Sequence, residues 1–327
     1  MKSNKKNPQA TRRVDGSRGD DTKTSGPLDD KSASAVSSQV VTARATPMHE
    51  QGRRRLLPFW TERPHRDYDL VRLMPATLGK RKRFETIPDA EGYRDANIRA
   101  LGRVGGFQDV VQSMKSCSAG KPCANILCSV CGRGYRRWLG GQTLSMTKAT
   151  HVDVVTILML EVAAQDLPGV DLDALHERLR KRLKRAGITA AIGGTEQNYD
   201  AARDVWIVHF HLLVFGTNDD AYRRLAEIAR KDGIDRPIKR QPLKDPARQL
   251  SYIQKFQTYH RPGKPGMRGK GRAYPLAPIQ MGQLASWTSQ SQFNDFLFLL
   301  GFRRLGSRIV PTPATDALLR KPRLRRH

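Results

Sequence analysis

The sequence is poor in acidic residues and has no long apolar run. It holds 31 Asp and Glu against 58 Lys and Arg, a formal net charge of +27. Such an excess implies a polyanionic partner, with nucleic acid the first choice. No apolar run reaches the roughly 20 residues that a membrane span needs, and the polar N-terminus lacks the apolar segment of a secretory signal. These absences predict a cytoplasmic nucleic-acid-binding protein without a membrane partner.

Aromatic residues are absent from residues 1–55, which are rich in Lys, Arg, Ser, Asp, Thr and Gly. Such a composition cannot bury enough apolar surface to fold, so we expect a disordered basic tail. Residues 56–116 give a mixed pattern with a predicted helix over 90–98. We treat this stretch as an accessory region that either covers the core or reaches to DNA.

Cysteine is rare and confined to one window: Cys117, Cys123, Cys128 and Cys131. In a cytosolic chain, clustered cysteines more often ligate zinc than form disulfides. Only the last two have the spacing of a familiar knuckle, and the alternative is that the cysteines are incidental. We predict a structural zinc knuckle over residues 117–138.

A basic and aromatic stretch follows the cysteines, with Arg133, Tyr135, Arg136, Arg137 and Trp138. A zinc knuckle would stabilise a helix here. We therefore predict that Arg136 and Arg137 contact DNA phosphates.

Residues 152–260 alternate between strand and helix patterns. Strands are predicted over 152–162, 188–199, 205–216 and 236–243, and helices over 172–186, over 221–231 and from 245 onward. This order is the split β-α-β arrangement of ferredoxin-like domains, an α+β fold with helices on one face of an antiparallel sheet. The first helix carries leucines on one side and, on the other, Arg178, Lys181, Arg182 and Arg185. A charged face is solvated by default, and Arg182 is our candidate DNA contact on it.

The strand predicted over 205–216 contains His209 and His211 among apolar residues. Side chains two positions apart share one face of a strand. A single core histidine usually satisfies one hydrogen bond, but two adjacent imidazoles need partners or a shared cation. Glu196 lies on the preceding strand of the same hairpin. One carboxylate and two imidazoles would leave open coordination positions and suit Mg²⁺ or Mn²⁺ better than zinc.

A candidate nucleophile lies on the helix that begins near Asp245. Tyr252 and Lys255 are three residues apart and share a face, with Arg248 one turn earlier. A phenol ionises near pH 10, so it needs a nearby cation to attack at neutral pH. Lys255 could supply that charge and Arg248 could hold the phosphate.

The ordered set of these motifs resembles the HUH endonucleases, specifically the rolling-circle plasmid replication initiators. Thr195-Glu196 matches that family's glutamate strand, 206–211 its metal-binding strand and 245–255 its tyrosine helix. A Cys-rich segment before the first strand also recurs there, so the resemblance covers about 117–259.

Four positions depart from or qualify the family pattern. Ile207 and Val208 replace the usual His-Pro, and the proline before the last cysteine is absent. Phe256 stands where a second tyrosine would be, which implies a single-tyrosine enzyme with Tyr259 as a structural phenol.

The resemblance implies metal-dependent nicking and rejoining of single-stranded origin DNA through a 5′-phosphotyrosyl link on Tyr252. A host polymerase would extend the released 3′-hydroxyl. The sequence has no Gly-rich phosphate loop, so unwinding would fall to a host helicase. The alternatives are an HUH transposase or relaxase, or a non-catalytic nucleic-acid-binding protein.

Residues 261–327 form the last predicted region. A loop of Gly, Pro and cations comes first, an apolar helix is predicted over 293–302, and a basic tail runs from residue 320 to the end. Loop and tail would add phosphate contacts.

Overall fold

The computed structural model describes residues 86–118, 121–148, 151–231, 237–246, 249–250, 259–261, 274–289 and 291–320. The predicted N-terminal tail and the basic segments 262–273 and 321–327 lie outside the described residues. Arg248, Tyr252 and Lys255 lie outside them as well.

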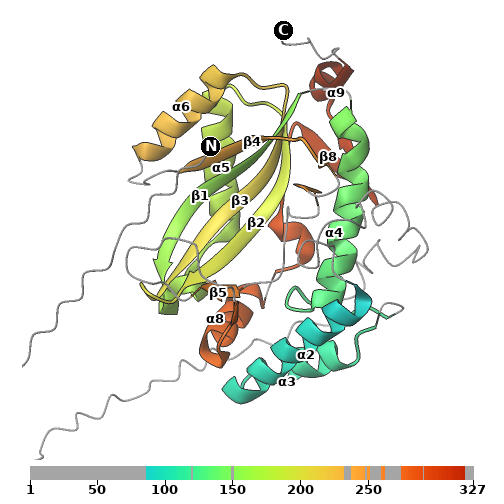
Figure 1. Cartoon of the computed structure of the whole chain (residues 1–327), viewed down its shortest axis with the longest axis vertical. Helices are drawn as coiled ribbons and strands as arrows, with labels where there is room; N and C mark the ends of the chain where they lie inside the picture. Colours follow the sequence, from blue (N-terminus) through green and yellow to red (C-terminus); the bar gives the residue numbers. More distant parts are fainter. Residues whose placement is uncertain are drawn as a thin grey trace, which may run out of the picture. The chain divides into compact units, whose positions relative to one another are not determined.

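The fold is α+β and is built on an antiparallel sheet (Figure 1). Strands β1 (Val152–Ala163), β2 (Ala191–Asp200), β3 (Val205–Phe215) and β4 (Ile238–Pro242) lie in the order β4-β1-β3-β2. Strand β7 (Leu297–Leu300) pairs with β2 and is the fifth antiparallel strand. At the other end of β2, the short β5 (Tyr259–Arg261) pairs in parallel with β2, and β6 (Tyr274–Pro275) pairs with β5.

Two helices pack against the sheet, α5 (Leu172–Ala186) and α6 (Asp219–Arg230). The leucine stripe of α5 is buried. The helix begins after Asp171, whose carboxylate accepts from the Ala174 amide, and ends at Gly187 in the left-handed region. The order β1-α5-β2-β3-α6-β4 is the one that the hydrophobic periodicity predicted, so that prediction is confirmed.

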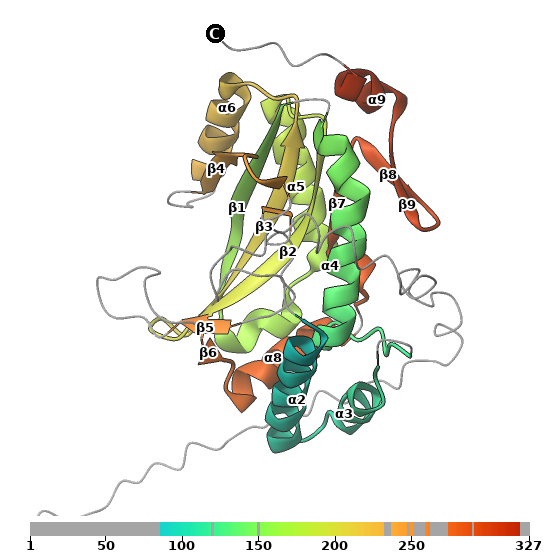
Figure 2. The same ribbon diagram turned by 45° about the vertical axis from the view of Figure 1, so that its right-hand side comes forward.

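Helices α2 (Ile87–Val104), α3 (Gln108–Lys115) and α4 (Ser129–Leu144) precede the sheet in the chain (Figure 2). Helix α2 begins with a capping box between Thr86 and Asp89, and it packs against α3, α4 and α8 (Pro278–Thr288). The predicted helix over 90–98 is therefore the middle of a longer one. The remaining elements are η3 (Ser145–Lys148), η4 (Ala164–Gly169), β5 (Tyr259–Arg261), β6 (Tyr274–Pro275), α8 (Pro278–Thr288), η5 (Phe293–Phe296), β8 (Phe302–Leu305), β9 (Arg308–Pro311) and α9 (Pro313–Arg320).

The apolar helix predicted over 293–302 is wrong. The structure has the single turn η5 there, followed by strand β7 and the start of strand β8. A short apolar run fits a buried strand as well as a buried helix, and local periodicity does not separate them. The unpaired edge of β2 decides the outcome, because β7 satisfies its backbone groups. Gly301 then turns the chain at φ +74°, where a Cβ atom would lie 2.4 Å from the Thr189 carbonyl oxygen.

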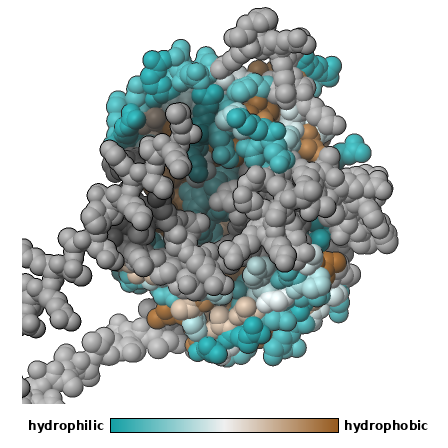
Figure 3. Space-filling view, in the orientation of Figure 1, coloured by the Kyte–Doolittle hydropathy of each residue, from teal (hydrophilic) through white to brown (hydrophobic). Residues whose placement is uncertain are grey.

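The described surface is mostly hydrophilic in the view of Figure 3, with a few apolar spots. The large hydrophobic side chains exposed among the described residues are Ile87, Tyr93, Val104, Ile279 and Leu305. No helix within the described ranges combines the length and apolar character needed to cross a membrane.

Two candidate metal centres

Glu196, His209 and His211 converge on one face of the β2–β3 hairpin. Glu196 lies directly opposite His209 in the strand register, and His211 follows on the same face. All three are buried, with 5 to 8% of their surface exposed. The Nε2 atoms of the two imidazoles are 3.1 Å apart, and Glu196 Oε2 lies 3.4 Å from His209 Nε2 and 3.0 Å from His211 Nε2. These three residues form the group that we call the Glu/His/His triad.

The triad has the dimensions of one side of a metal coordination shell. Ligands at about 2.1 Å from an ion are separated by about 3.0 Å in an octahedron and about 3.4 Å in a tetrahedron. The observed edges of 3.0, 3.1 and 3.4 Å match those values. Three ligands on one side leave the opposite positions open, so the triad can hold a divalent ion that still accepts another ligand.

The surrounding sheet orients His211. Its Nδ1 lies 2.8 Å from Thr156 Oγ1, on the residue that pairs with it in β1. This contact fixes the orientation of the ring, so that Nε2 faces the triad. On the other side, Gly194 pairs with His211 and places no side chain beside it, while a Cβ atom at Gly193 would lie 1.9 Å from the His211 carbonyl oxygen.

The triad carries a negative charge at Glu196. Burial by itself raises the pKa of that carboxyl, but attraction to His211 and hydrogen bonds from both imidazoles outweigh it and hold the pKa well below its usual range. Glu196 is therefore a carboxylate at neutral pH, the form that binds a cation.

A third histidine supports the triad from the helix side of the sheet, and sequence reasoning missed it. His176 Nε2 on α5 lies 3.0 Å from Thr195 Oγ1, and its ring meets Phe210 edge-on at 5.2 Å. Burial, with a smaller contribution from Arg180, lowers the pKa of His176 to about 4. The sequence could have predicted this burial, because His176 lies on the leucine face of the helix.

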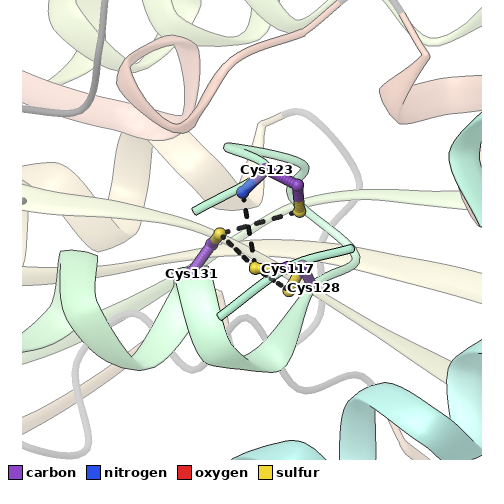
Figure 4. Close-up of side chains that lie close together, drawn as sticks. All are labelled: Cys117, Cys123, Cys128 and Cys131. Carbon is purple, nitrogen blue, oxygen red and sulfur yellow. Dashed lines mark hydrogen bonds between the residues drawn. The ribbon is translucent and has the colours of Figure 1, made fainter. Parts of the chain in front are cut away.

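The four cysteines form a second, closed group (Figure 4). Cys117 follows α3, Cys128 is the N-cap of α4 and Cys131 lies in its first turn, with Cys123 in the intervening loop. Neighbouring sulfur atoms are 3.5 to 3.7 Å apart. Zinc–sulfur bonds of about 2.3 Å place the corners of a tetrahedron about 3.8 Å apart. The Cys cluster therefore has the ligand number and dimensions of a structural metal site.

Helix α2 holds the two loops that carry these cysteines. Arg94 donates a hydrogen bond of 2.7 Å to the carbonyl oxygen of Cys117, and Asn97 donates one of 2.9 Å to that of Leu127. Hydrogen bonds from the neighbouring thiols also hold the pKa of Cys117 well below its usual range. Arg94 thus places a positive charge beside a cluster that becomes anionic when its thiols ionise.

Two of the predicted DNA contacts are not where the sequence placed them. Arg182 is only 3% exposed and donates to the Met159 sulfur at 3.1 Å, and Arg136 is 7% exposed. These guanidinium groups do not lie on a solvated face, because each turns inward from its helix. Arg137 is half-buried, and burial lowers its pKa to about 10.

Comparison with known proteins returned no match to this chain. No protein-family model, no curated protein and no solved structure matches it. The inference of function therefore rests on the side chains that the fold brings together.

Proposed function

We propose that this chain is an HUH endonuclease, a single-tyrosine initiator of rolling-circle replication that nicks and rejoins single-stranded origin DNA. The observation that carries the proposal is the triad, in which a carboxylate and two imidazoles converge on one face of an antiparallel sheet. The strand order β4-β1-β3-β2 with helices between the strands supports a ferredoxin-like HUH domain.

The ion that we assign to the triad is Mg²⁺ or Mn²⁺, held by Glu196, His209 and His211. When bound, it polarises the scissile phosphodiester and neutralises charge that develops on it. Thr156 keeps the His211 ring in place. We assign zinc to the Cys cluster, where four thiolates leave no open position and the role is structural.

Tyr252 is the proposed nucleophile. Its phenolate oxygen attacks the phosphorus, a new phosphorus–oxygen bond to the tyrosine forms, and the bond to the 3′-oxygen breaks. The departing 3′-oxygen takes a proton and becomes the hydroxyl that a host polymerase extends. In this proposal Lys255 supplies the positive charge that favours the phenolate, and Arg248 holds the phosphate. Because the phosphotyrosyl bond keeps the energy of the phosphodiester, the reverse attack rejoins the strand.

The net charge of +27 suits a DNA substrate. The proposed partners are a single-stranded origin, a host helicase and a host polymerase. An HUH transposase or relaxase would use the same chemistry on another DNA, so cleavage confined to a replication origin distinguishes the initiator.

Covalent capture tests the proposal. Purified protein, Mn²⁺ and a labelled single-stranded oligonucleotide are mixed and run on a denaturing gel. Capture is expected for the wild type and abolished in Tyr252→Phe, which still binds the oligonucleotide. Tyr259→Phe is the matched control and retains capture. Equal capture by Tyr252→Phe would show that another residue is the nucleophile. Oligonucleotide binding by the wild type without any capture would favour a non-catalytic protein.

A further inference from the structure

The hairpin of strands β8 and β9 presents an exposed leucine between arginines. Arg303 and Leu305 alternate on one face of β8, and Arg308 pairs with Leu305 across the turn, so all three share a face. All three are exposed, Leu305 to 53%. Arg303 and Arg308 form no ion pair with any described residue, so their charges face outward.

The hairpin is fixed at its base. Its inner face carries Phe302 and Ile309, both buried in the core. Helix α4 also holds the turn, because the Trp138 indole donates 2.8 Å to the Ser307 carbonyl oxygen and the Ile309 amide donates 3.1 Å to the Gln142 side chain. Because the tip is already ordered, Leu305 would lose little conformational entropy when it contacts a partner.

The hairpin itself carries charge of one sign. The segment 302–311 contains three arginines and no acidic residue, and α4 contains no acidic residue either. The two segments contact each other, although some 160 residues separate them in the chain. The partner that fits this surface is a polyanion.

We infer that the β8–β9 hairpin binds a groove of duplex DNA, with Arg303 and Arg308 on phosphates and Leu305 wedged against a base step. A two-stranded ribbon can lie in a DNA groove, and apolar side chains inserted between base steps from the minor groove kink the duplex. Single-strand sites depend on aromatic stacking, and the outer face of this hairpin has no aromatic side chain. One leucine also buries too little apolar surface to hold a lipid bilayer.

The hairpin lies within one DNA turn of the triad. Leu297 pairs with Gly194, which pairs with His211, so β7 begins at the level of the triad. The eight residue-to-residue steps from Leu297 to Leu305 span at most about 26 Å, less than the roughly 34 Å of one turn. The hairpin would therefore grip the duplex beside the nick, and only this placement rests on the proposed function.

Binding of a fluorescent duplex of about three helical turns to the full-length protein tests the inference. R303E/R308E is expected to weaken binding at least tenfold at low salt and to reduce the slope of log affinity against log salt by about two. Leu305→Ala is expected to weaken binding severalfold without changing that slope, and to abolish the kink measured by energy transfer between the duplex ends. Melting temperatures confirm that each variant folds.

Matched controls lie elsewhere on the described surface. K184E/R185E makes the same charge change on α5, and Ile279→Ala removes another exposed aliphatic side chain. An equal loss of binding from these variants, or none from the hairpin variants, would overturn the inference. The inference would also be overturned if binding to anionic phospholipid vesicles depended on Leu305 while binding to the duplex did not. The readout requires no cleavage, so failure of the nuclease proposal would leave this result standing.

Discussion

The Cys cluster and the triad are both metal-sized groups, but they are built in opposite ways. The cluster takes four ligands from loops and a helix start, and four thiolates complete a tetrahedron. The triad takes three ligands from two paired strands and covers one side of an ion. The first arrangement is closed and suits a structural ion, and the second is open and suits chemistry.

The supporting contacts differ in the same sense. Hydrogen bonds from Arg94 and Asn97 on α2 hold the loops that carry the cysteines, and bringing four thiolates together costs electrostatic repulsion without a cation. The triad is held by backbone register, with Thr156 on one side of the strand and His176 behind it. We therefore expect metal loss to unfold the first region and to inactivate the second without unfolding it.

Replacing a cysteine should have the largest effect. Cys131→Ser is expected to remove one zinc per chain and lower the melting temperature by more than about 10 °C, because structural zinc binding is part of the folding free energy. Metal analysis and calorimetry measure both. Ser116→Ala, at an exposed hydroxyl nearby, is the control. If Cys131→Ser had an unchanged metal content and melting temperature, the Cys cluster would not differ from the triad in its contribution to folding.

Removing an imidazole from the triad should affect activity far more than stability. His209→Ala is expected to reduce Mn²⁺-dependent strand capture about a thousandfold, the value of several kcal/mol of metal assistance, with melting shifted by only a few degrees. His151→Ala, a half-exposed histidine outside the triad, should retain capture. A stability loss in His209→Ala as large as in the cysteine variant would make the triad a structural site.

The layer behind the triad should give a pH-dependent stability. His176 has its pKa lowered to about 4 by burial, so the unfolded chain binds more protons between pH 6.5 and pH 4. The stability that depends on a neutral His176 is fully present above pH 6.5. As the pH falls from 6.5 to 4, the free energy of unfolding decreases by about 3 kcal/mol. Urea unfolding over this range measures it. His176→Gln should flatten the profile, and an unchanged slope would contradict the assignment.

The smallest effect is expected at Thr156. Thr156→Val removes the hydroxyl beside His211 Nδ1 and should weaken Mn²⁺ binding about 10- to 100-fold, as changes to outer ligand contacts do. Titration with Mn²⁺ measures the affinity. Thr156→Ser keeps the hydroxyl and should restore it, while zinc content stays constant in both. Equal affinity in the Val variant would show that the sheet alone orients the ring.

Local pattern predicted most of the sheet domain and part of the triad. Period-two alternation puts His209 and His211 on one face, and this follows from the sequence alone. The sequence placed Glu196 on the neighbouring strand but left its alignment with the histidines open, because the register of a hairpin depends on how its turn closes. Here residues 201–204 make that turn, and Glu196 pairs with His209. The burial of Arg182 could not be predicted from the sequence pattern either, because it depends on the contact between this side chain and a sulfur atom in a neighbouring strand.

By itself, the sequence determined the excess of positive charge, the order of strands and helices over 152–242 and the clustering of cysteines, because these depend on composition and short-range periodicity. The tertiary structure decided that Glu196 lies opposite His209 in the strand register, that the four sulfur atoms gather within 4.8 Å of one another and that 297–300 is a strand. Each of these depends on pairing between segments distant in the chain, where the free energy of a contact is set by the partner and not by the local residues.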